Sequence, residues 1–255
     1  MIGAIAGDII GSVFEHHAIK STQFPLFSRY SGFTDDTVLT VAIADSILKK
    51  VDYATSLKTF AQKYPYAGYG SSFFRWIFSS DSRPYNSWGN GSAMRVSPVG
   101  FAFDSMEDVL SEAKKSAEVT HNHPEGIKGA QATALAVFMA RSGKSKATIK
   151  QEISDRFGYN LDRALDDIRP HYSFDISCQG SVPEAIIAFL EGKDFEDAIR
   201  KAISLGGDSD TQACIAGGVA QAYYQNIPRE IVSDVRKRLP EEFLLIIDEF
   251  SEQYC

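Results

Sequence analysis

Apolar residues recur along most of the chain with the spacing of one face of an α-helix. Between residues 104 and 119 the apolar side chains follow positions i, i+3, i+4, i+7 and i+11, namely Met106, Val109, Leu110, Ala113 and Ala117. Similar spacing predicts helices over residues 37–50, 54–64, 124–141, 183–191, 194–204, 211–225, 228–238 and 241–253. Strict alternation of apolar and polar residues is not sustained anywhere. The pattern therefore predicts an all-α fold.

Residues typical of helix starts agree with these predicted helices. Asp104 and Asp194 are suitable N-caps, and prolines lie near four predicted helix starts, at Pro124, Pro183, Pro228 and Pro240. Residues 79–100 and 170–182 are instead rich in Gly, Ser, Asn and Pro, which predicts two long and therefore functional loops. Neither loop is typical of a linker between two cores, so we expect a single domain over residues 1–255.

Composition narrows the class of protein. The chain is 44% hydrophobic and 23% charged, which suits a large buried core, and its net charge of -7 with no basic run longer than two lysines argues against nucleic-acid binding. Three cysteines are too few for a disulfide framework. The apolar N-terminal stretch lacks a basic region, and no other stretch reaches the ~18 apolar residues of a membrane span. We expect a cytoplasmic protein without a membrane partner.

Two acidic sequences, "TDDT" at 34–37 and "GGDSDT" at 206–211, each open a predicted helix. An aspartate at a helix start stabilises the helix by typically ~0.3–1 kcal/mol, so an N-cap with Thr34 as the capping residue is one interpretation. Two acids within three residues exceed what one cap can use, however. The repetition of the arrangement therefore favours a second interpretation, a cation site.

A shared site would follow if the two helix starts converge. Asp35, Asp36, Asp208 and Asp210 would then bring four like charges together, which is strongly unfavourable unless cations lie between them. Oxygen donors without His or Cys select Mg²⁺, Mn²⁺ or Ca²⁺ over zinc. Because four carboxylates more than balance one dication, two ions are expected.

The N-terminal segment contributes a third set of residues. Gly3, Gly7 and Gly11 share one helical face, which favours close helix packing over ligand contact. Asp8 is expected to cap or pair locally. Glu15 ends the segment, where it could reach a metal or poise a water, although a solvated glutamate is the usual fate of such a residue.

The "SWGNGSAMR" sequence is typical of an anion-binding turn. Gly89 and Gly91 flank Asn90 and lead into a helix expected near Ser92, so consecutive N–H groups could hold a diphosphate. The Gly-x-Gly spacing alone is weak evidence, because the sequence "GYGSSFF" at 68–74 also contains it and is not expected to bind an anion. Trp88 could stack on a base, although a core position is the default.

Two histidines, His121 and His123, lie two positions apart. A zinc site is not expected here, because no third His or Cys lies nearby in the sequence. A neutral imidazole bonded to a phosphate or ribose hydroxyl and an ordinary cap before Pro124 are equally good interpretations.

Together the sequences "AGDIIGSVFE", "TDDT", "GNGSAMR", "THNHPEG" and "GGDSDT", the last followed by "AGGVAQAYY", resemble the ADP-ribosylglycohydrolase family over the whole chain. The resemblance implies an orthogonal multi-helix bundle with a binuclear Mg²⁺ centre in a cleft, Mn²⁺ being the alternative. By motif position it implies the metal ligands Glu15, Thr34, Asp35, Asp36, Asp208, Asp210 and Thr211.

The resemblance also implies a substrate, an ADP-ribosyl group joined through its anomeric carbon to a protein or small-molecule acceptor. Nucleic acid is expected only as a modified acceptor, and the enzyme is expected to be a monomer. By motif position the substrate-binding residues are Asp35, Trp88, Gly89, Asn90, Gly91, Ser92, Met94, His121 and Ser209.

The catalytic residues implied by the resemblance are Glu15, for proton transfer or water positioning, and Asp36, for bridging metal and nucleophile. Some family members carry an acid shortly before Gly-Asn-Gly, whereas this chain has Asn86 and Ser87, so that role does not transfer. The loops 16–33 and 170–182 would select the acceptor, with Tyr172, Phe174 and Cys178 either lining its site or packing.

Two other functions stay open from the residues alone. A two-metal phosphohydrolase would share the acidic sequences, but only five His are present and none lies beside them. A non-catalytic ADP-ribose-binding or crystallin-like structural protein would be expected to have lost acids. Because Glu15, Asp35, Asp36, Asp208 and Asp210 are all present, an enzyme is favoured.

Overall fold

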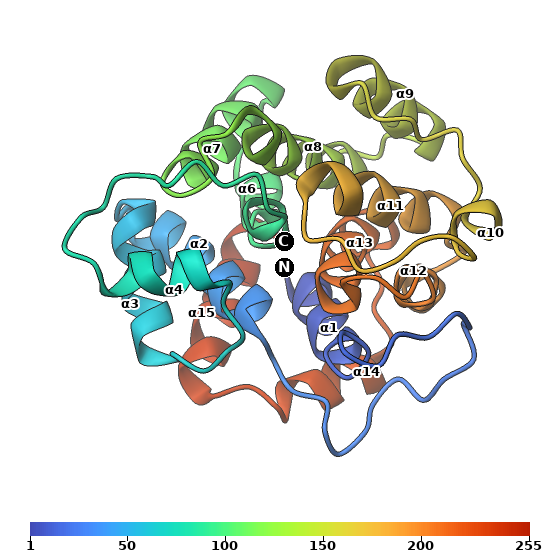
Figure 1. Ribbon diagram of the computed structural model, residues 1–255, viewed down its shortest axis with the longest axis horizontal. Helices are drawn as coiled ribbons and strands as arrows, with labels where there is room; N and C mark the ends of the chain where they lie inside the picture. Colours follow the sequence, from blue (N-terminus) through green and yellow to red (C-terminus); the bar gives the residue numbers. More distant parts are fainter.

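The computed structural model describes residues 1–255 and contains helices without any β-strand (Figure 1). The helices are α1 (Ile2–Gly11), α2 (Asp35–Lys49), α3 (Tyr53–Lys63), α4 (Ser71–Phe78), α5 (Gly91–Met94), α6 (Ser97–Ala102), α7 (Met106–Glu118), α8 (Pro124–Arg141), α9 (Lys146–Phe157), α10 (Leu165–Ile168), α11 (Cys178–Glu191), α12 (Phe195–Ile203), α13 (Ser209–Tyr224), α14 (Arg229–Arg236) and α15 (Glu241–Tyr254). The all-α prediction is confirmed.

Helices α1 and α13 form the closely packed centre of the molecule (Figure 1). A Cβ atom added at Gly3 would lie 2.6 Å from the carbonyl oxygen of Gly217, and one added at Gly11 would lie 2.5 Å from Cα of Asp210. The backbones therefore touch directly, and the helix-packing interpretation of this glycine face is confirmed. The contact also brings the end of α1 to the acidic start of α13.

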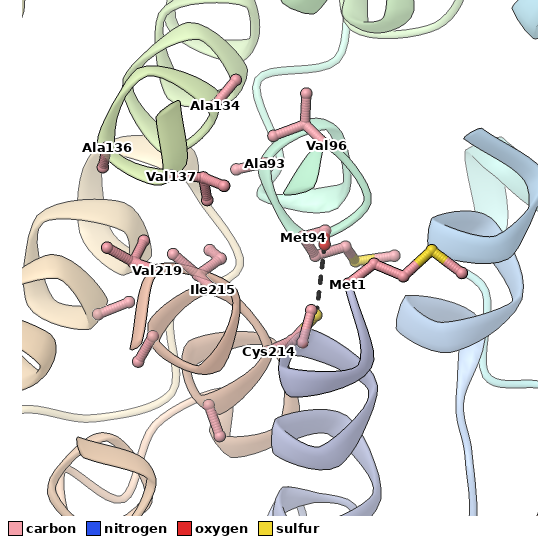
Figure 2. Close-up of a cluster of buried hydrophobic side chains, with 14 of the residues drawn as sticks. Met1, Ala93, Met94, Val96, Ala134, Ala136, Val137, Cys214, Ile215 and Val219 are labelled. Carbon is pink, nitrogen blue, oxygen red and sulfur yellow. Dashed lines mark hydrogen bonds between the residues drawn. The ribbon is translucent and has the colours of Figure 1, made fainter. Parts of the chain in front are cut away.

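The other helices surround this pair. Helices α8, α11 and α12 pack against α13, α7 packs on α8, and α2 packs on α3 and α15 (Figure 1). Figure 2 shows the core where α5, α8 and α13 meet, with Met94, Val137 and Ile215 among the buried side chains. There the Cys214 thiol donates to the carbonyl oxygen of Met94 at 3.3 Å. The short helix that follows Gly89–Gly91 is thus anchored to α13.

Several predicted boundaries are wrong, for identifiable reasons. Helix α11 begins at Cys178 and contains Pro183 internally, because Ser177 caps it by accepting from Gly180 N at 3.0 Å. The cap of α7 is Ser105, whose Oγ accepts from Asp108 N at 3.0 Å, so Asp104 is not the cap. Asp194 does cap α12.

Four helices that neither the periodicity nor the glycine patterns predicted are α4, α6, α9 and α10. Helix α4 spans only eight residues and leaves Phe74 and Phe78 exposed beside the buried Phe73, so its apolar run does not show which residues face the core. Helix α9 buries only Ile149 and Ile153, which is too little for a clear pattern. Helices α5 and α6 also interrupt the predicted loop 79–100. None of the helices has the length and apolar character needed to cross a membrane.

Candidate active site

The N-termini of α2 and α13 meet at one pocket, together with the residues that follow α1. Thr211 Oγ1 donates to Asp36 Oδ2 at 3.3 Å. Carboxylate oxygens of Glu15, Asp208 and Asp210 all lie within 4.8 Å of one another. The predicted convergence of the two acidic helix starts is therefore confirmed.

The buried carboxylate of Asp8 holds the start of α2. Its Oδ2 accepts from the backbone N of Thr34 at 3.0 Å and of Thr37 at 3.1 Å, and its Oδ1 accepts from Thr34 Oγ1 at 2.7 Å. The Thr37 hydroxyl also donates to Oδ2. Thr34 is the N-cap of α2, as predicted. The expectation of a local role for Asp8 is wrong, because its partners lie on a different helix.

Burial and mutual repulsion dominate the electrostatics of these acids. Burial raises the pKa of Asp35, Asp36 and Asp210 well above the ordinary value, and neighbouring carboxylates raise it further. Burial likewise raises the pKa of Glu15, with Asp208 adding to the effect. No Lys or Arg forms an ion pair with any of them. Apart from the exposed imidazole of His16, whose Nε2 lies 3.7 Å from Glu15 Oε2, the cluster is therefore a concentration of negative charge without protein counter-charge.

The donor set suits a hard divalent cation. Asp36 Oδ1 is buried and has no hydrogen-bond partner, so a cation would satisfy an atom that the protein leaves unpaired. The group that could hold a metal ion, Glu15, Asp208 and Asp210, offers carboxylate oxygens alone. The residues present thus fit the expected metal centre.

The acidic start of α13 is held by the Gly-Asn-Gly loop. Asp208 makes no side-chain capping bond to α13. Instead Asn90 Nδ2 donates to Asp208 Oδ2 at 2.7 Å and to Ser181 Oγ at 3.1 Å. The loop is fixed in turn by Asn90 N, which donates to the carbonyl of Ile176 at 2.8 Å. The Gly-Asn-Gly loop and the acidic cluster are consequently parts of one structure.

The resulting pocket has a volume of about 390 Å³. The expected site residues among its lining are Glu15, Asp35, Asp36, Gly89, Asn90, Gly91, Met94, His121, Asp208, Asp210 and Thr211. Both acidic segments, the loop and one histidine therefore face a single cavity.

Four expected site residues do not line the pocket. Thr34 Oγ1 is bonded to Asp8. Ser92 Oγ donates to the carbonyl of Gly126 at 2.7 Å, and Ser209 is buried with its Oγ 3.2 Å from the carbonyl of Gly207. Trp88 is 48% exposed, so the default core position for this side chain is wrong.

The two histidines have separate roles. His121 is buried against the loop and lines the pocket. His123 Nδ1 accepts from Glu125 N at 3.2 Å and caps α8. The capping interpretation is thus correct for His123, whereas the ligand-bonding interpretation of His121 stays a prediction.

Some lining residues escaped the sequence interpretation. The segment "GYGSSFF" at 68–74 supplies Gly68, Gly70 and Phe73 to the pocket wall. Its composition, rich in glycine and serine, did not indicate this position. Of the residues that the sequence analysis named in the 170–182 segment, Phe174 does line the pocket, whereas Cys178 is buried at the start of α11. Tyr85 and Arg95 complete the wall near His121, and neither had any spacing signal.

Comparison with known proteins agrees with this site. The family model for ADP-ribosylglycohydrolase matches residues 1–254. The chain belongs to the ADP-ribosylglycohydrolase family. It is therefore an enzyme that hydrolyses glycosidic linkages to ADP-ribose.

Curated relatives carry related names. The chain is 29% identical to ADP-ribosylhydrolase ARH3 of Homo sapiens, over 88% of this chain and 84% of that protein. It is 26% identical to ADP-ribosylarginine hydrolase Tri1 of Pseudomonas putida (strain GB-1), over 92% and 72% respectively. A solved structure described as an ADP-ribosylglycohydrolase-related protein complex superimposes with a TM-score of 0.75 at 24% identity, covering 99% of this chain and 95% of that one. This last likeness concerns the fold.

Proposed function

We propose that the pocket holds two Mg²⁺ ions, with Mn²⁺ as the alternative, and that they serve hydrolysis of the bond between ADP-ribose and its acceptor. The observation that carries the proposal is the convergence of Glu15, Asp36, Asp208 and Asp210 on one cavity beside the Gly-Asn-Gly loop. Such a cluster lowers its free energy when cations replace the missing counter-charge.

The proposed metal ligands are the acids of both helix starts with the adjacent hydroxyls, namely Glu15, Thr34, Asp35, Asp36, Asp208, Asp210 and Thr211. Thr34 is the least direct of these, because its hydroxyl already bonds to Asp8. When bound, the ions would supply charge compensation for the sugar hydroxyls and lower the pKa of water.

The chain's own groups would bind and orient the substrate. We assign the diphosphate to Gly89–Gly91 and His121, which lie together on one wall. Glu15 is assigned to proton transfer with water, because its carboxylate reaches the acidic cluster while its side chain stays 29% exposed. Asp36 is assigned to orienting the nucleophile through its unpaired Oδ1.

The acceptor is proposed to lie at the pocket mouth beside exposed apolar side chains. Phe174 and Ile176 line the pocket and are 51% and 56% exposed, and Trp88 lies in the adjoining loop. These side chains give an acceptor an apolar platform rather than a charged one. A panel of linkages that includes ADP-ribosylarginine, after the name of one relative, is the suitable probe.

We also propose that the enzyme acts as a cytoplasmic monomer. The three cysteines are free, two of them buried, which suits a reducing compartment. Light scattering on the purified protein, with and without Mg²⁺, tests the oligomeric state.

The test of the proposed function compares wild type with Asp210→Ala on arginine-, serine- and acetyl-linked ADP-ribose, with mass spectrometry of the products. Release of free ADP-ribose is expected to need Mg²⁺ or Mn²⁺, to stop in EDTA, and to disappear in the variant. Asp248→Ala removes an exposed acid paired with Arg236 and is the matched control. Full activity in EDTA contradicts the metal role, and phosphoester cleavage without ribosyl release would indicate a phosphohydrolase instead.

A further inference from the structure

Arg95, the residue that follows α5, is a buried cation that no carboxylate neutralises. Its Nη2 donates to the carbonyl of Ser116 at 2.8 Å and to Thr120 Oγ1 at 2.9 Å, while Nε and Nη1 have no partner. The side chain is fully buried and lies against the pocket wall. Because a buried charge without compensation is costly, its position calls for an explanation.

The bonds of Arg95 limit the hydrogen-bond directions open to its neighbours. A guanidinium only donates hydrogen bonds, so Thr120 Oγ1 must accept from Arg95. Thr120 Oγ1 has a second lone pair and could also accept from a protonated His121 Nδ1, which lies 2.8 Å away. Of the two hydrogen bonds of Thr120 Oγ1, however, only the one to His121 Nδ1 offers an acceptor for the hydroxyl proton, which favours Nδ1 as the acceptor. A neutral imidazole in that arrangement carries its proton on Nε2.

The Nε2 atom of His121 is directed at the Gly-Asn-Gly loop. A Cβ added at Gly91 would lie 3.2 Å from Nε2, and one added at Gly89 would lie 3.7 Å from it. Nε2 itself has no partner in the protein, and His121 lines the pocket. Burial, followed by the charge of Arg95, holds the pKa of His121 well below its ordinary value. A neutral donor therefore faces the loop.

We propose that Arg95 and Thr120 are positioning residues that fix His121 as the Nε2–H tautomer, so that it donates a hydrogen bond to an anion held by Gly89–Gly91. The inference rests on the proposed function in one respect, the identity of that anion as the diphosphate of ADP-ribose. It also explains the unneutralised cation, because the positive potential of Arg95 favours an anionic ligand at this wall.

The first experiment determines the tautomer in the ligand-free protein. Histidines are labelled with ¹⁵N, and long-range ¹H–¹⁵N spectra distinguish protonated from unprotonated ring nitrogens; His121→Asn assigns the resonances of His121. Wild type and Thr120→Ser are expected to show unprotonated Nδ1 and protonated Nε2. Thr120→Val keeps the volume but removes the hydroxyl, so its His121 is expected to populate both tautomers. Protonated Nδ1 in wild type overturns the inference.

The second experiment measures what the tautomer contributes to anion binding. Calorimetric titration with ADP is expected to give an about threefold to tenfold weaker Kd for Thr120→Val, the size of one lost hydrogen bond, with recovery in Thr120→Ser. Adenosine, which lacks the phosphates, is expected to bind all three proteins alike. Equal ADP affinity in Thr120→Val and wild type contradicts the role assigned to His121.

The two failures can be told apart. If wild type releases no ADP-ribose from any acceptor, the proposed substrate is wrong, while the tautomer and the ADP titration still decide the roles of Arg95 and Thr120. If hydrolysis occurs but the tautomer is reversed, only the positioning inference fails.

Discussion

The starts of α2 and α13 carry similar acidic sequences, yet they are held in opposite ways. At α2 the capping hydroxyl of Thr34 satisfies the helix, and Asp8 binds the same backbone from beneath. At α13 no side chain caps the helix, and Asn90 reaches in from a loop to hold Asp208. One acidic end is therefore fixed by the core and the other by the Gly-Asn-Gly loop.

The difference teaches how a repulsive cluster can be preorganised. A rigid end keeps Asp36 in place without metal, at the cost of burying the Asp8 carboxylate, whose pKa burial raises to about 6. The other end couples the position of Asp208 to the Gly-Asn-Gly loop. Ligand at the loop and cations at the acids would consequently support each other.

The largest expected effect comes from neutralising either acidic end. Asp36→Asn and Asp210→Asn are each expected to lower kcat/KM at least about a thousandfold, because each removes a proposed ligand of the shared cations. The double variant is expected to be hardly worse than either single one, since both disable the same unit. Additive losses in steady-state assays would indicate two independent sites.

Removing the core anchor should have the next largest effect. Asp8→Ala leaves the Thr34 and Thr37 donors without their acceptor and is expected to cost roughly 2–4 kcal/mol in urea unfolding. Metal affinity should fall by about 10–100-fold. Asp52→Ala removes the cap of α3, away from the pocket, and should destabilise without changing metal affinity. Unchanged metal affinity in Asp8→Ala would show that this anchor only supports folding.

Removing the loop anchor should be milder for the fold and still visible in function. Asn90→Ala is expected to lower activity by about tenfold or more while costing at most about 1.5 kcal/mol in stability. Ser181→Ala removes the other partner of Asn90 and serves as the control. If Asn90→Ala destabilised the protein as strongly as Asp8→Ala, the distinction between the two anchors would be lost.

The smallest effect concerns stability against pH in the metal-free protein. Because the folded-state pKa of Asp210 is raised above 3.8, the folded state holds more protons than the unfolded state, and this contribution to stability falls as pH rises above about 3.8. Asp210→Asn should therefore gain stability relative to wild type between pH 4 and 7, by a few degrees in Tm. Mg²⁺ should reverse the order. Parallel pH profiles without metal would contradict the raised pKa.

Much of the site was predictable because its acids lie within short sequences. The two helix starts carry more acids than capping requires, namely Asp35, Asp36, Asp208 and Asp210. Oxygen donors of this kind indicate hard divalent cations as the metal class, even without coordinates. The roles of Trp88 and the 68–73 segment were not predictable. Whether a side chain is exposed or lines a cavity depends on neighbours that are distant in the sequence. A segment rich in glycine and serine has no pattern that shows which part of the protein it packs against.

The sequence by itself determined the helical class, the acidic helix starts and the close-packing glycine face, because helix periodicity, capping chemistry and the absence of Cβ are local properties. Only the tertiary structure decided that Asp8 supports α2, that Asn90 holds Asp208, and that Arg95, Thr120 and His121 lie in one hydrogen-bonded chain. The physical reason is that hydrogen bonds between distant segments require particular distances and donor directions. Those follow from how the helices pack, and no spacing along one segment encodes them.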